Sequence, residues 1–265
     1  MTAKTGLLGY PVAQSKSPLI HDYWMKQHGI DGTYEAMKVI NDHLPRAVQA
    51  LKNHHFKGFN ITVPHKENIM ALCDEIDDTA RAIGAVNTVV IDSDKVIGRN
   101  TDAFGFIENM NGFDVRGKTV LVLGAGGAAK AALYGLQQAG AAKIILTNRT
   151  RAKAEAMQDN NIEILDWDKK ESALNAIDLL VNTTSLGMAG KPPLEINLTT
   201  LNPSAHVYDI VYAPLMPPLL TTAKAQGNPV ITGIGMLLHQ ARPAFKSWHG
   251  IMPEVDEALL DLVLL

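Results

Sequence analysis

The sequence predicts an α/β protein of two domains, and three features of the chain support this fold class. Short β-rich runs alternate with helical patterns almost to the C-terminus, which is typical of a parallel α/β architecture. The run from Thr119 to Leu123 is continuously apolar, as in a parallel strand that is covered on both faces. The pattern loosens at Gly105, Asn111-Gly112 and Gly117, so we expect a domain boundary near residues 103–117.

Local signals place the elements of the first half. Leu7-Leu8 belongs to a strand that leads into a serine-rich turn, and Ser17 as N-cap with Pro18 at the first helical position predicts a helix start. Strands are then expected at 33–39 and 59–63, with a helix at 44–53 between them. Residues 85–91 and 96–97 flank a polar turn at 92–95, which predicts a β-hairpin.

The second half repeats the alternation with more continuous apolar runs. Strands are expected at 119–123, 143–147, 179–182, 207–211 and 230–232. An alanine-rich helix follows the first of them to about Gln138, and further helices start near Thr150, Glu171 and Pro218. This order predicts parallel strands joined by helical crossovers.

Composition narrows the class of partner. With 46% hydrophobic and 19% charged residues among 265, the chain resembles ordinary globular proteins. A net charge of −3 and an isoelectric point near 6.3 provide no basic field for nucleic acid or for an anionic membrane. We therefore expect a small metabolite as the partner.

Location, disulfides and metals are also constrained by the sequence. No apolar run approaches the roughly 20 residues of a membrane span, and the N-terminus lacks the apolar core of a signal peptide, so we expect a cytoplasmic protein. Cys73 is the single cysteine, which excludes an intrachain disulfide. The nine histidines lack the spacing of metal ligands, so no metal site is expected.

The turn after the apolar run has the form of a dinucleotide fingerprint. Gly124 permits a tight turn, Gly126 lets the backbone approach a pyrophosphate, and Ala129 keeps the next helix close to the sheet. The phosphates would meet free N–H groups and the positive end of the helix dipole. The alternative is a glycine-rich turn that serves packing alone.

The end of the following strand indicates which dinucleotide is bound. An NAD site normally carries Asp or Glu there for the ribose hydroxyls, whereas this chain has Asn148-Arg-Thr-Arg151 and then Lys153. Arg149 can pair with a 2′-phosphate, and Thr150 can donate its hydroxyl. These residues predict NADP(H), although Thr150 also fits a plain helix N-cap.

The stretch from Asn60 to Lys66 has the residues of a site for a small hydroxylated molecule. In an extended strand Asn60 and Thr62 share one face, while Ile61 and Val63 fill the opposite, buried face. The amine of Lys66 can exchange a proton if burial lowers its pKa from about 10.4. The alternative is a strand edge followed by an ordinary surface lysine.

Further polar motifs accompany these stretches along nearly the whole chain. They are Gly9-Tyr-Pro-Val-Ala-Gln-Ser-Lys-Ser-Pro18, Asn60-Ile-Thr-Val-Pro-His-Lys66, Gly84-Ala-Val-Asn-Thr88, Asn100-Thr-Asp102, Gly124-Ala-Gly-Gly-Ala128, Asn148-Arg-Thr150, Asn182-Thr-Thr-Ser-Leu-Gly-Met188, Asp209-Ile-Val-Tyr212 and Gly235-Met236 through Trp248-His-Gly250. In kind and in order, these motifs resemble those of the shikimate dehydrogenase family.

The resemblance implies an activity and a domain layout. The activity is the reversible, NADPH-dependent reduction of 3-dehydroshikimate to shikimate on the chorismate pathway to aromatic amino acids. The layout is a substrate-binding domain at 1–103, a doubly wound NADP-binding domain of Rossmann type at 104–235, and C-terminal helices at 236–265 that return to the first domain. Lys66 and Asp102 would be the catalytic pair.

The resemblance and the fingerprint together give the expected residues of both sites. Ser15 and Ser17 would bind the substrate carboxylate, and further substrate contacts would come from Asn60, Thr62, Lys66, Asn87, Asp102, Tyr212 and Gln240. The cofactor would be contacted by Asp78, Gly124, Ala125, Gly126, Gly127, Ala128, Asn148, Arg149, Thr150, Lys153, Thr183, Ser185, Ile210 and Gly233.

Departures from the family pattern and two rival functions stay open. Gln14 stands where the family commonly has His, and residues 213–217 replace a segment that usually carries Asn and Thr. One rival is a quinate/shikimate dehydrogenase with relaxed cofactor use. The other is a non-catalytic NADP(H)-binding regulator on the same fold, which would not need Lys66 and Asp102. The sequence does not decide between a monomer and a homodimer.

Overall fold

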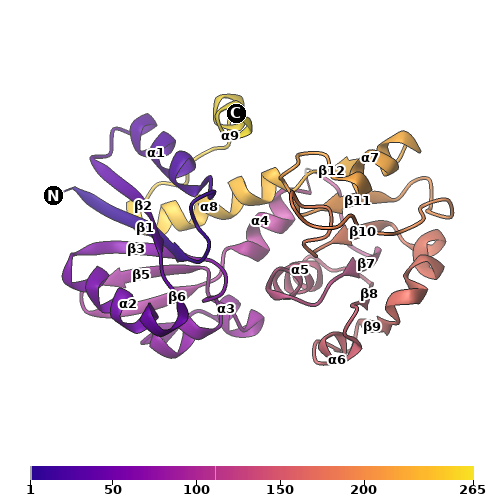
Figure 1. The fold of residues 1–265 in the computed structure, drawn as a ribbon, viewed down its shortest axis with the longest axis horizontal. Helices are drawn as coiled ribbons and strands as arrows, with labels where there is room; N and C mark the ends of the chain where they lie inside the picture. Colours follow the sequence, from indigo (N-terminus) through magenta and orange to yellow (C-terminus); the bar gives the residue numbers. More distant parts are fainter. Residues whose placement is uncertain (1, 111) are drawn as a thin grey trace. The chain divides into compact units, whose positions relative to one another are not determined.

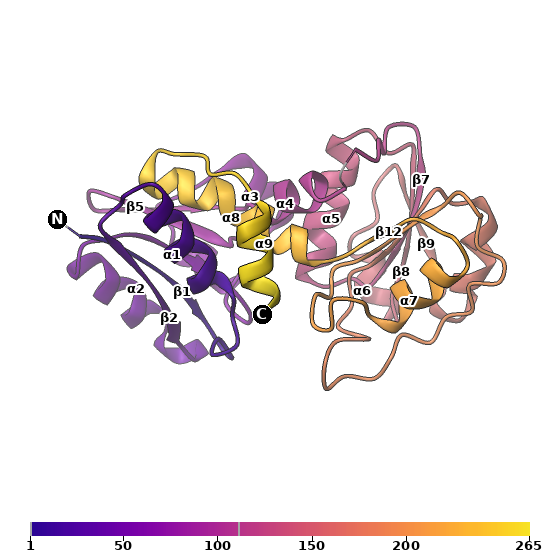
Figure 2. The same cartoon turned by 90° about the horizontal axis from the view of Figure 1, so that it is seen from above.

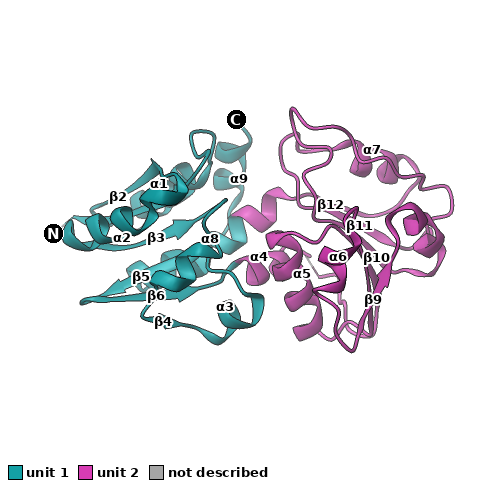
Figure 3. Ribbon diagram, turned by 60° about the horizontal axis from the view of Figure 1, so that its bottom comes forward, with its two compact units in different colours: residues 1–101, 238–265 teal, residues 102–237 magenta. Residues whose placement is uncertain are grey.

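The computed structural model describes residues 2–110 and 112–265. Met1, at the start of the predicted first domain, and Asn111, in the predicted boundary, lie outside the described residues. The chain divides into two compact units, which Figure 3 shows in two colours. Unit 1 comprises Met1–Thr101 with Leu238–Leu265, and unit 2 comprises Asp102–Leu237. Residues 103–108, at the start of the predicted boundary, belong to helix α4 (Asp102–Glu108) of unit 2.

The sheet of unit 1 is mixed, with its parallel strands side by side. Its strand order is β2 (Gly32–Lys38), β1 (Ala3–Gly9), β3 (Phe56–Ile61), β5 (Thr88–Asp92), β6 (Lys95–Arg99) and β4 (Glu75–Ile76). β1 runs parallel to β2 and β3, whereas β5 is antiparallel to β3 and to β6, which forms the predicted hairpin with it. The carboxyl ends of β1, β2 and β3 therefore lie at one edge of the sheet (Figure 1).

Helices cover both faces of this sheet. On one face, α2 (Leu44–Asn53) packs in a core with Phe59 and Ile61. On the other face lie α1 (Ser17–Gln27) and α8 (Ile234–His249), as Figure 2 shows from above. α8 approaches the strand at Gly58, where a Cβ atom would be 2.2 Å from Trp248 Nε1. The absence of a side chain at residue 58 is what allows this indole to lie on the sheet and to donate to the Val89 carbonyl at 2.9 Å.

The C-terminal segment returns to unit 1, as the fold-class prediction states. The indole of Trp24 on α1 donates to the Glu254 carbonyl at 3.0 Å. The hydroxyl of Tyr23 donates to Asp256 at 2.8 Å, and Asp256 also caps α9 (Glu257–Leu264) by accepting from the Leu259 N–H. α1 is thereby fixed between the sheet and the end of the chain.

The sheet of unit 2 is parallel and doubly wound. Its strand order is β12 (Val230–Ile231), β11 (His206–Asp209), β10 (Leu179–Asn182), β7 (Thr119–Leu123), β8 (Lys143–Thr147) and β9 (Ile162–Leu165). Adjacent strands are parallel throughout. Starting from β7, the chain first builds outward to β9 and then returns to β10 on the other side of β7. This is the order of the Rossmann fold, and it confirms the predicted fold class.

Alternate residues of β7 serve the two faces of this sheet. Val120 and Val122 pack in a core that includes residues of α4 and α5 (Gly127–Gln138). Leu121 and Leu123 pack in a second core, with the 3₁₀ segment η3 (Trp167–Ala176) and α7 (Pro218–Ala225). Burial on both faces explains why the sequence of β7 is apolar without interruption.

Several local predictions differ from the structure. The helix expected near Glu171 is the 3₁₀ segment η3, which begins at Trp167. Ser17 is the first residue of α1 rather than its cap, because the N-cap is Lys16, which already has helical backbone angles (φ −81°, ψ −4°). The sequence analysis did not predict β4, β9, α3 (Asp78–Ile83) or the 3₁₀ segments η1 (Asn41–His43) and η2 (Asn68–Leu72). The helix expected near Thr150 is the short α6 (Arg151–Glu155).

Candidate functional site

The chain leaves the sheet of unit 1 directly after Ile61, the last residue of β3. Ile61 is buried, as predicted. Val63 is 60% exposed, so the prediction that it fills the buried face is wrong. The physical reason is a turn in which the His65 N–H donates to the Thr62 carbonyl at 3.0 Å, so the alternation of a strand no longer applies.

The side chain of Asn60 is buried and bonded at both ends within unit 1. Its Oδ1 accepts a hydrogen bond from the Tyr34 hydroxyl at 2.7 Å. Its amide nitrogen donates to the Asn87 carbonyl at 3.1 Å and to Thr88 Oγ1 at 3.0 Å. A primary amide has two N–H donors, so both are committed to protein acceptors in this conformation.

Asn87 connects residues that are far apart in the sequence. Its Oδ1 accepts from the Thr101 N–H at 2.8 Å and from the Thr88 hydroxyl at 3.0 Å. Its amide donates to Gln240 Oε1 on α8 at 3.4 Å. The structure therefore brings together Asn60, Asn87 and Gln240, all predicted substrate residues. Thr88 and Thr101 were missed by the sequence analysis, although each directly follows an asparagine in one of the motifs.

Ser15 and Ser17 lie in the loop between β1 and α1 and at the first position of that helix. Their Oγ atoms are 3.2 Å apart, with the Ser15 hydroxyl donating to that of Ser17. Ser17 is buried and Ser15 is half-buried. Two hydroxyls at the positive end of a helix dipole suit a carboxylate, which agrees with the role that the resemblance implies.

Lys66 and Asp102 are each attached, through the backbone, to the segment around Asn87. The Lys66 carbonyl accepts from the Val86 N–H at 2.8 Å, and its side chain is half-buried. Asp102 follows Thr101, whose backbone is bonded to Asn87, and is itself buried at the start of α4. Lys66 belongs to unit 1, and Asp102 is the first residue of unit 2.

The glycine turn of unit 2 lies where the strand order reverses, between β7 and β10. Gly124 has a φ of +107°, and a Cβ atom there would be 2.8 Å from Thr183 Oγ1. The Thr183 hydroxyl donates to the Leu123 carbonyl at 2.8 Å, which fixes the end of β10 against the turn. In open α/β sheets, ligands bind at this topological switch point.

The following residues of the turn fit a pyrophosphate. A Cβ atom added at Gly126 or Gly127 would meet nothing within 4 Å, so the backbone there borders open space. Gly126 precedes α5, and Ala128 lies in the first turn of that helix, where N–H groups are free for an anion. The N–H of Ala125 is held by Asn148 Oδ1 at 3.2 Å.

The segment after β8 carries the predicted specificity residues. Arg149, Thr150 and Lys153 are exposed, and Asn148 bridges from the turn to the Thr150 carbonyl at 2.8 Å. Arg151 is committed elsewhere, since it is paired with Glu155 and Asp166. The strand end therefore presents the cationic side chains of Arg149 and Lys153 and no carboxylate at residues 148–150, as an NADP site requires.

The ends of β10 and β11 are joined by a buried polar pair. The amide of Asn182 donates to both carboxylate oxygens of Asp209, at 3.0 and 3.1 Å. It also lies 3.2 Å from the Leu186 carbonyl, in the loop that carries Ser185. Burial raises the pKa of Asp209 to about 6, against the opposing effects of Asn182 and the Val211 N–H. The motifs contain both residues, but the sequence analysis assigned no role to either.

The remaining predicted residues of the two sites, cofactor contacts apart from the substrate residue Tyr212, are placed as follows. Ile210 and Tyr212 follow β11, and burial raises the pKa of the Tyr212 phenol. Gly233 touches this segment, because a Cβ there would be 2.2 Å from the Ile210 carbonyl oxygen. Ser185 is exposed in the loop after β10. Asp78 is the exposed first residue of α3 and lies in unit 1.

Residues 2–110 and 112–265 lack the features of a metal centre and of a membrane span. They contain no group of three or more His, Cys, Asp or Glu side chains arranged to hold a metal ion. In the same residues, no helix is long and apolar enough to cross a membrane.

The doubly wound sheet, the glycine turn at its switch point and the appended α/β unit define a dinucleotide-binding protein with a separate unit for its substrate. Residues 7–89 match the family model for the shikimate dehydrogenase substrate binding domain, and residues 107–189 match that for shikimate / quinate 5-dehydrogenase. A shikimate dehydrogenase (NADP(+)) of Rhodospirillum rubrum is 46% identical over 98% of this chain and 96% of its own. The chain belongs to the shikimate dehydrogenase family.

Solved structures agree with this membership. The shikimate 5-dehydrogenase of Thermus thermophilus, in complex with NADP(H) and shikimate, has a TM-score of 0.90 and 33% identity, over 99% of this chain and 98% of that chain. The 5-ketofructose reductase of a Gluconobacter strain has a TM-score of 0.91, also with 33% identity, over 100% and 98%. Proteins with this fold are therefore named for more than one substrate, so the substrate of this protein must be argued from its site.

Proposed function

We propose that this protein is an NADP(H)-dependent shikimate dehydrogenase that reversibly reduces 3-dehydroshikimate to shikimate. The observation that carries the proposal is the cluster of polar side chains at the strand ends of unit 1. Asn87 and Gln240 meet within hydrogen-bond distance, and Ser15 and Ser17 form a hydroxyl pair at a helix start. Hydroxyl and amide groups of this kind match a ring that carries hydroxyls and a carboxylate.

Each part of the cluster has a role in this proposal. Ser15 and Ser17 bind the carboxylate, while Thr62, Asn87 and Gln240 contact ring hydroxyls. Both amide donors of Asn60 are engaged with Asn87 and Thr88. We therefore revise the predicted role of Asn60 from a direct contact with a ring hydroxyl to a support for Asn87.

Lys66 and Asp102 carry the proton chemistry in this proposal. When bound, the reduced dinucleotide supplies hydride to the substrate carbonyl carbon. Negative charge then develops on the carbonyl oxygen, where the Lys66 ammonium stabilises it and donates a proton. Asp102 orients the reacting hydroxyl and the amine.

Unit 2 supplies the cofactor site. The turn at 124–128 holds the pyrophosphate against the first turn of α5, and Arg149 with Thr150 and Lys153 takes the 2′-phosphate. Thr183, Ser185, Ile210 and Gly233 form the nicotinamide side, with Tyr212 as a substrate contact. Asp78, on α3, is the remaining predicted cofactor contact.

The proposed function is tested by initial rates with four substrate pairs: shikimate or quinate, each with NADP⁺ or NAD⁺. We expect the highest kcat/KM for shikimate with NADP⁺. Comparable rates with quinate and with NAD⁺ would instead identify an enzyme that accepts both substrates and both cofactors. No turnover with either acid would leave the non-catalytic regulator as the better account.

One further substrate separates this protein from the 5-ketofructose reductase of the same fold. 5-Ketofructose has no carboxylate, so it cannot use the hydroxyl pair of Ser15 and Ser17 as shikimate does. We expect NADPH oxidation with 3-dehydroshikimate and little with 5-ketofructose. The opposite preference would contradict the assigned substrate.

We place the activity in the cytoplasm, where the NADPH pool and the other enzymes of a biosynthetic pathway are found. Fractionation of cells that express the tagged chain tests this location. Light scattering of the purified protein distinguishes a monomer from a homodimer.

A further inference from the structure

Thr88 is the first residue of β5, and its side chain is fully buried in the polar cluster of unit 1. Its hydroxyl accepts a hydrogen bond from the amide of Asn60 at 3.0 Å and donates one to Asn87 Oδ1 at 3.0 Å. A hydroxyl has one proton to donate and lone pairs to accept with, so it makes both bonds at once. Thr88 therefore links the side chain of Asn60 on β3 to that of Asn87.

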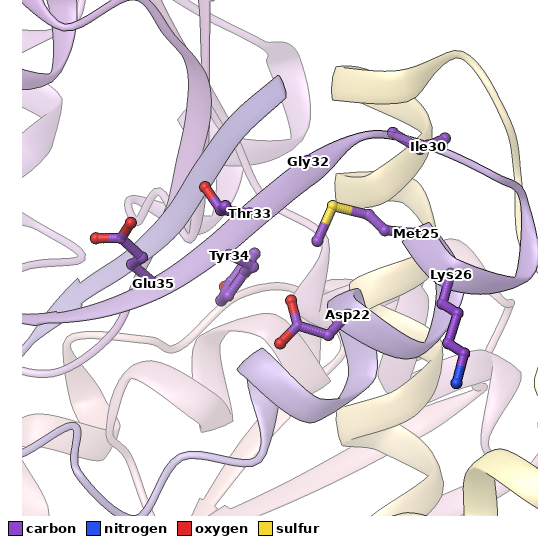
Figure 4. A pocket seen from close by; sticks show the side chains of 8 residues that line it. All are labelled: Asp22, Met25, Lys26, Ile30, Gly32, Thr33, Tyr34 and Glu35. Atoms are coloured by element: carbon purple, nitrogen blue, oxygen red, sulfur yellow. The ribbon is translucent and has the colours of Figure 1, made fainter. Parts of the chain in front are cut away.

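The side chain of Asn60 is oriented by its other neighbours. The Asn87 backbone carbonyl can only accept, so the amide nitrogen of Asn60 must face it, at 3.1 Å. Asn60 Oδ1 then faces the hydroxyl of Tyr34 on β2, which donates to it at 2.7 Å. The ring of Tyr34 stacks on that of His21, with centroids 4.2 Å apart, and Figure 4 shows it in the wall of a depression of about 480 Å³ between β2 and α1. Because the Asn60 amide donates to Thr88, the proton of Thr88 is left for Asn87 Oδ1.

The side chain of Asn87 is oriented in the same way. The Thr101 N–H can only donate, and its nitrogen lies 2.8 Å from Asn87 Oδ1, which fixes this end of the amide as the oxygen. The hydroxyls of Thr88 and Thr101 lie 3.0 and 3.2 Å from the same oxygen. The amide nitrogen of Asn87 therefore faces Gln240 Oε1 on α8, at 3.4 Å.

We propose that Thr88 is a positioning residue of the substrate site, because its hydroxyl holds Asn87 with its amide nitrogen toward Gln240. The inference rests on the proposed function, which assigns ring hydroxyls of the substrate to Asn87 and Gln240. Thr88 is fully buried, so it acts through Asn87 and does not touch the substrate. Its bond to Asn60 ties Asn87 to β3, in the interior of the sheet.

The test compares Thr88→Val with Thr88→Ser. Thr88→Val keeps the branched shape but loses the hydroxyl, so Asn87 Oδ1 loses a donor and the Asn60 amide loses an acceptor. Thr88→Ser keeps the hydroxyl and loses only a methyl group. We expect the KM for shikimate to rise about fivefold in Thr88→Val, with kcat and the KM for NADP⁺ changed less than about twofold. In Thr88→Ser the KM for shikimate should stay within about twofold of the wild-type value.

Thr5→Val is the matched control. Thr5 lies on β1 of the same sheet, is also fully buried, and donates its hydroxyl to the Thr33 carbonyl at 2.9 Å. Thr33 belongs to the edge strand β2, beside the depression in Figure 4. Thr5→Val therefore removes a buried threonine hydroxyl from the same sheet without changing a bond of Asn87, and it should leave kcat and both KM values unchanged.

Three results would overturn the proposal. If Thr88 had only a structural role, both valine variants would lower the melting temperature and neither would alter the KM for shikimate. A fall in kcat at constant KM would mean that the hydroxyl acts in the reaction step. A raised KM that persists in Thr88→Ser would mean that the hydroxyl is not the cause.

The melting temperature of each variant and its affinity for NADPH, which is bound by unit 2, show whether it is folded. If Thr88→Val does not fold, Thr88→Ala takes its place beside Thr88→Ser, since these two variants differ only in the hydroxyl. We expect the KM for shikimate to be about fivefold higher in Thr88→Ala than in Thr88→Ser. Equal values in the two variants would overturn the proposal.

Direct titration with shikimate separates this proposal from the proposed function. Turnover by the wild type together with unchanged shikimate affinity in Thr88→Val would overturn the role of Thr88 alone. If the wild type neither binds nor oxidises shikimate, the proposed function and the inference both fail.

A double-mutant cycle with Asn87→Ala tests the route through Asn87. If Thr88 acts through this side chain, Thr88→Val lowers the affinity for shikimate in the wild type but lowers it no further in Asn87→Ala. Additive losses of affinity in the double variant would overturn the proposal, because Thr88 would then act independently of Asn87.

Discussion

Asn182 and Asp209 meet at the ends of adjacent strands, where the amide of Asn182 donates to both oxygens of a carboxylate that is buried completely. Asp209 also accepts from the Val211 N–H at 2.9 Å. One carboxylate thus joins the loop after β10 to the segment after β11. Both segments carry residues that we assign to the nicotinamide side of the cofactor.

Asp209 is expected to make stability depend on pH. Burial raises its pKa to about 6 from the ordinary value of 3.8, so between these values the folded protein holds a proton that the unfolded chain has lost. The stabilising contribution of this group is therefore full below about pH 4 and lost as the pH rises through 6. Asp209→Asn keeps the shape and removes the titration.

The measurement is the free energy of unfolding in urea at pH 4 and at pH 7. Between pH 4 and pH 7, the free energy of unfolding of the wild type should fall by on the order of 3 kcal/mol more than that of Asp209→Asn. A difference between the two proteins that stays constant with pH would show that the carboxyl does not titrate in this range.

His21 should give a pH dependence of the opposite sign. Neither ring nitrogen has a hydrogen-bond partner among the described residues, and burial, followed by the nearby His249, lowers the pKa of His21 to about 3. Below pH 6.5 this histidine is protonated in the unfolded chain but stays neutral in the folded protein. The free energy of unfolding is therefore highest above pH 6.5 and falls as the pH is lowered toward 3. His21→Phe keeps an aromatic ring against Tyr34 without the titration.

Thermal unfolding at pH 7 and at pH 4 checks this prediction. From pH 7 to pH 4, the free energy of unfolding of the wild type should fall by about 3 kcal/mol more than that of His21→Phe. At pH 7 the variant should be at least as stable as the wild type, because the two ring nitrogens without hydrogen bonds are gone. Equal losses in both proteins would mean that His21 gains a partner or solvent when it is protonated.

The glycine turn offers a pair of matched substitutions. Gly124→Ala places a methyl group 2.8 Å from Thr183 Oγ1 at a positive φ, so it should lower the free energy of unfolding by about 2 kcal/mol. Gly126→Ala meets nothing within 4 Å and should leave stability nearly unchanged. Its methyl group would stand in the path of a pyrophosphate, and we expect the Kd for NADPH to rise at least about tenfold. Unchanged NADPH binding in Gly126→Ala would favour a turn that serves packing alone.

Arg149 is expected to select NADP(H) through the 2′-phosphate. Loss of a charge-assisted hydrogen bond should weaken NADPH binding by about tenfold or more in Arg149→Ala, and NADH binding far less. Arg151→Ala is the control, because it removes a nearby cation that is already paired with Asp166 and Glu155. Titration of all three proteins with both cofactors measures the ratio. If NADPH and NADH lose affinity equally in Arg149→Ala, the arginine does not contact the 2′-phosphate.

The sequence predicts those parts of the structure that depend on neighbours along the chain. β7, its turn and α5 follow from an apolar run, two glycines and an alanine-rich helix, all within 20 residues. The short strand β9 was not predicted, and η3 was expected as a helix that starts later, near Glu171. Residues of these segments, such as Glu163 and Trp167, show neither a helical nor a strand periodicity clearly. The prediction that Val63 is buried failed because an alternating pattern does not show at which residue the strand ends.

The site shows the same limit. Asn60, Asn87 and Gln240 were found as residue types in motifs, but their mutual contacts span up to 153 residues and depend on how α8 meets the sheet. Tyr34 and Asp209 were given no role for the same reason. A tyrosine on a strand and an aspartate after one gain a function only through partners from other strands, Asn60 and Asn182.

The central claim is that Lys66 is the proton donor of a shikimate dehydrogenase, and the kinetics of Lys66→Ala test it most directly. The measurement is kcat and KM for the reduction of 3-dehydroshikimate by NADPH, beside the melting temperature as a control for folding. The account predicts that kcat falls by about 10²–10⁴-fold while the KM for 3-dehydroshikimate changes little, as for an interaction made in the transition state. A large rise in KM with kcat intact would contradict it and would make Lys66 a binding residue.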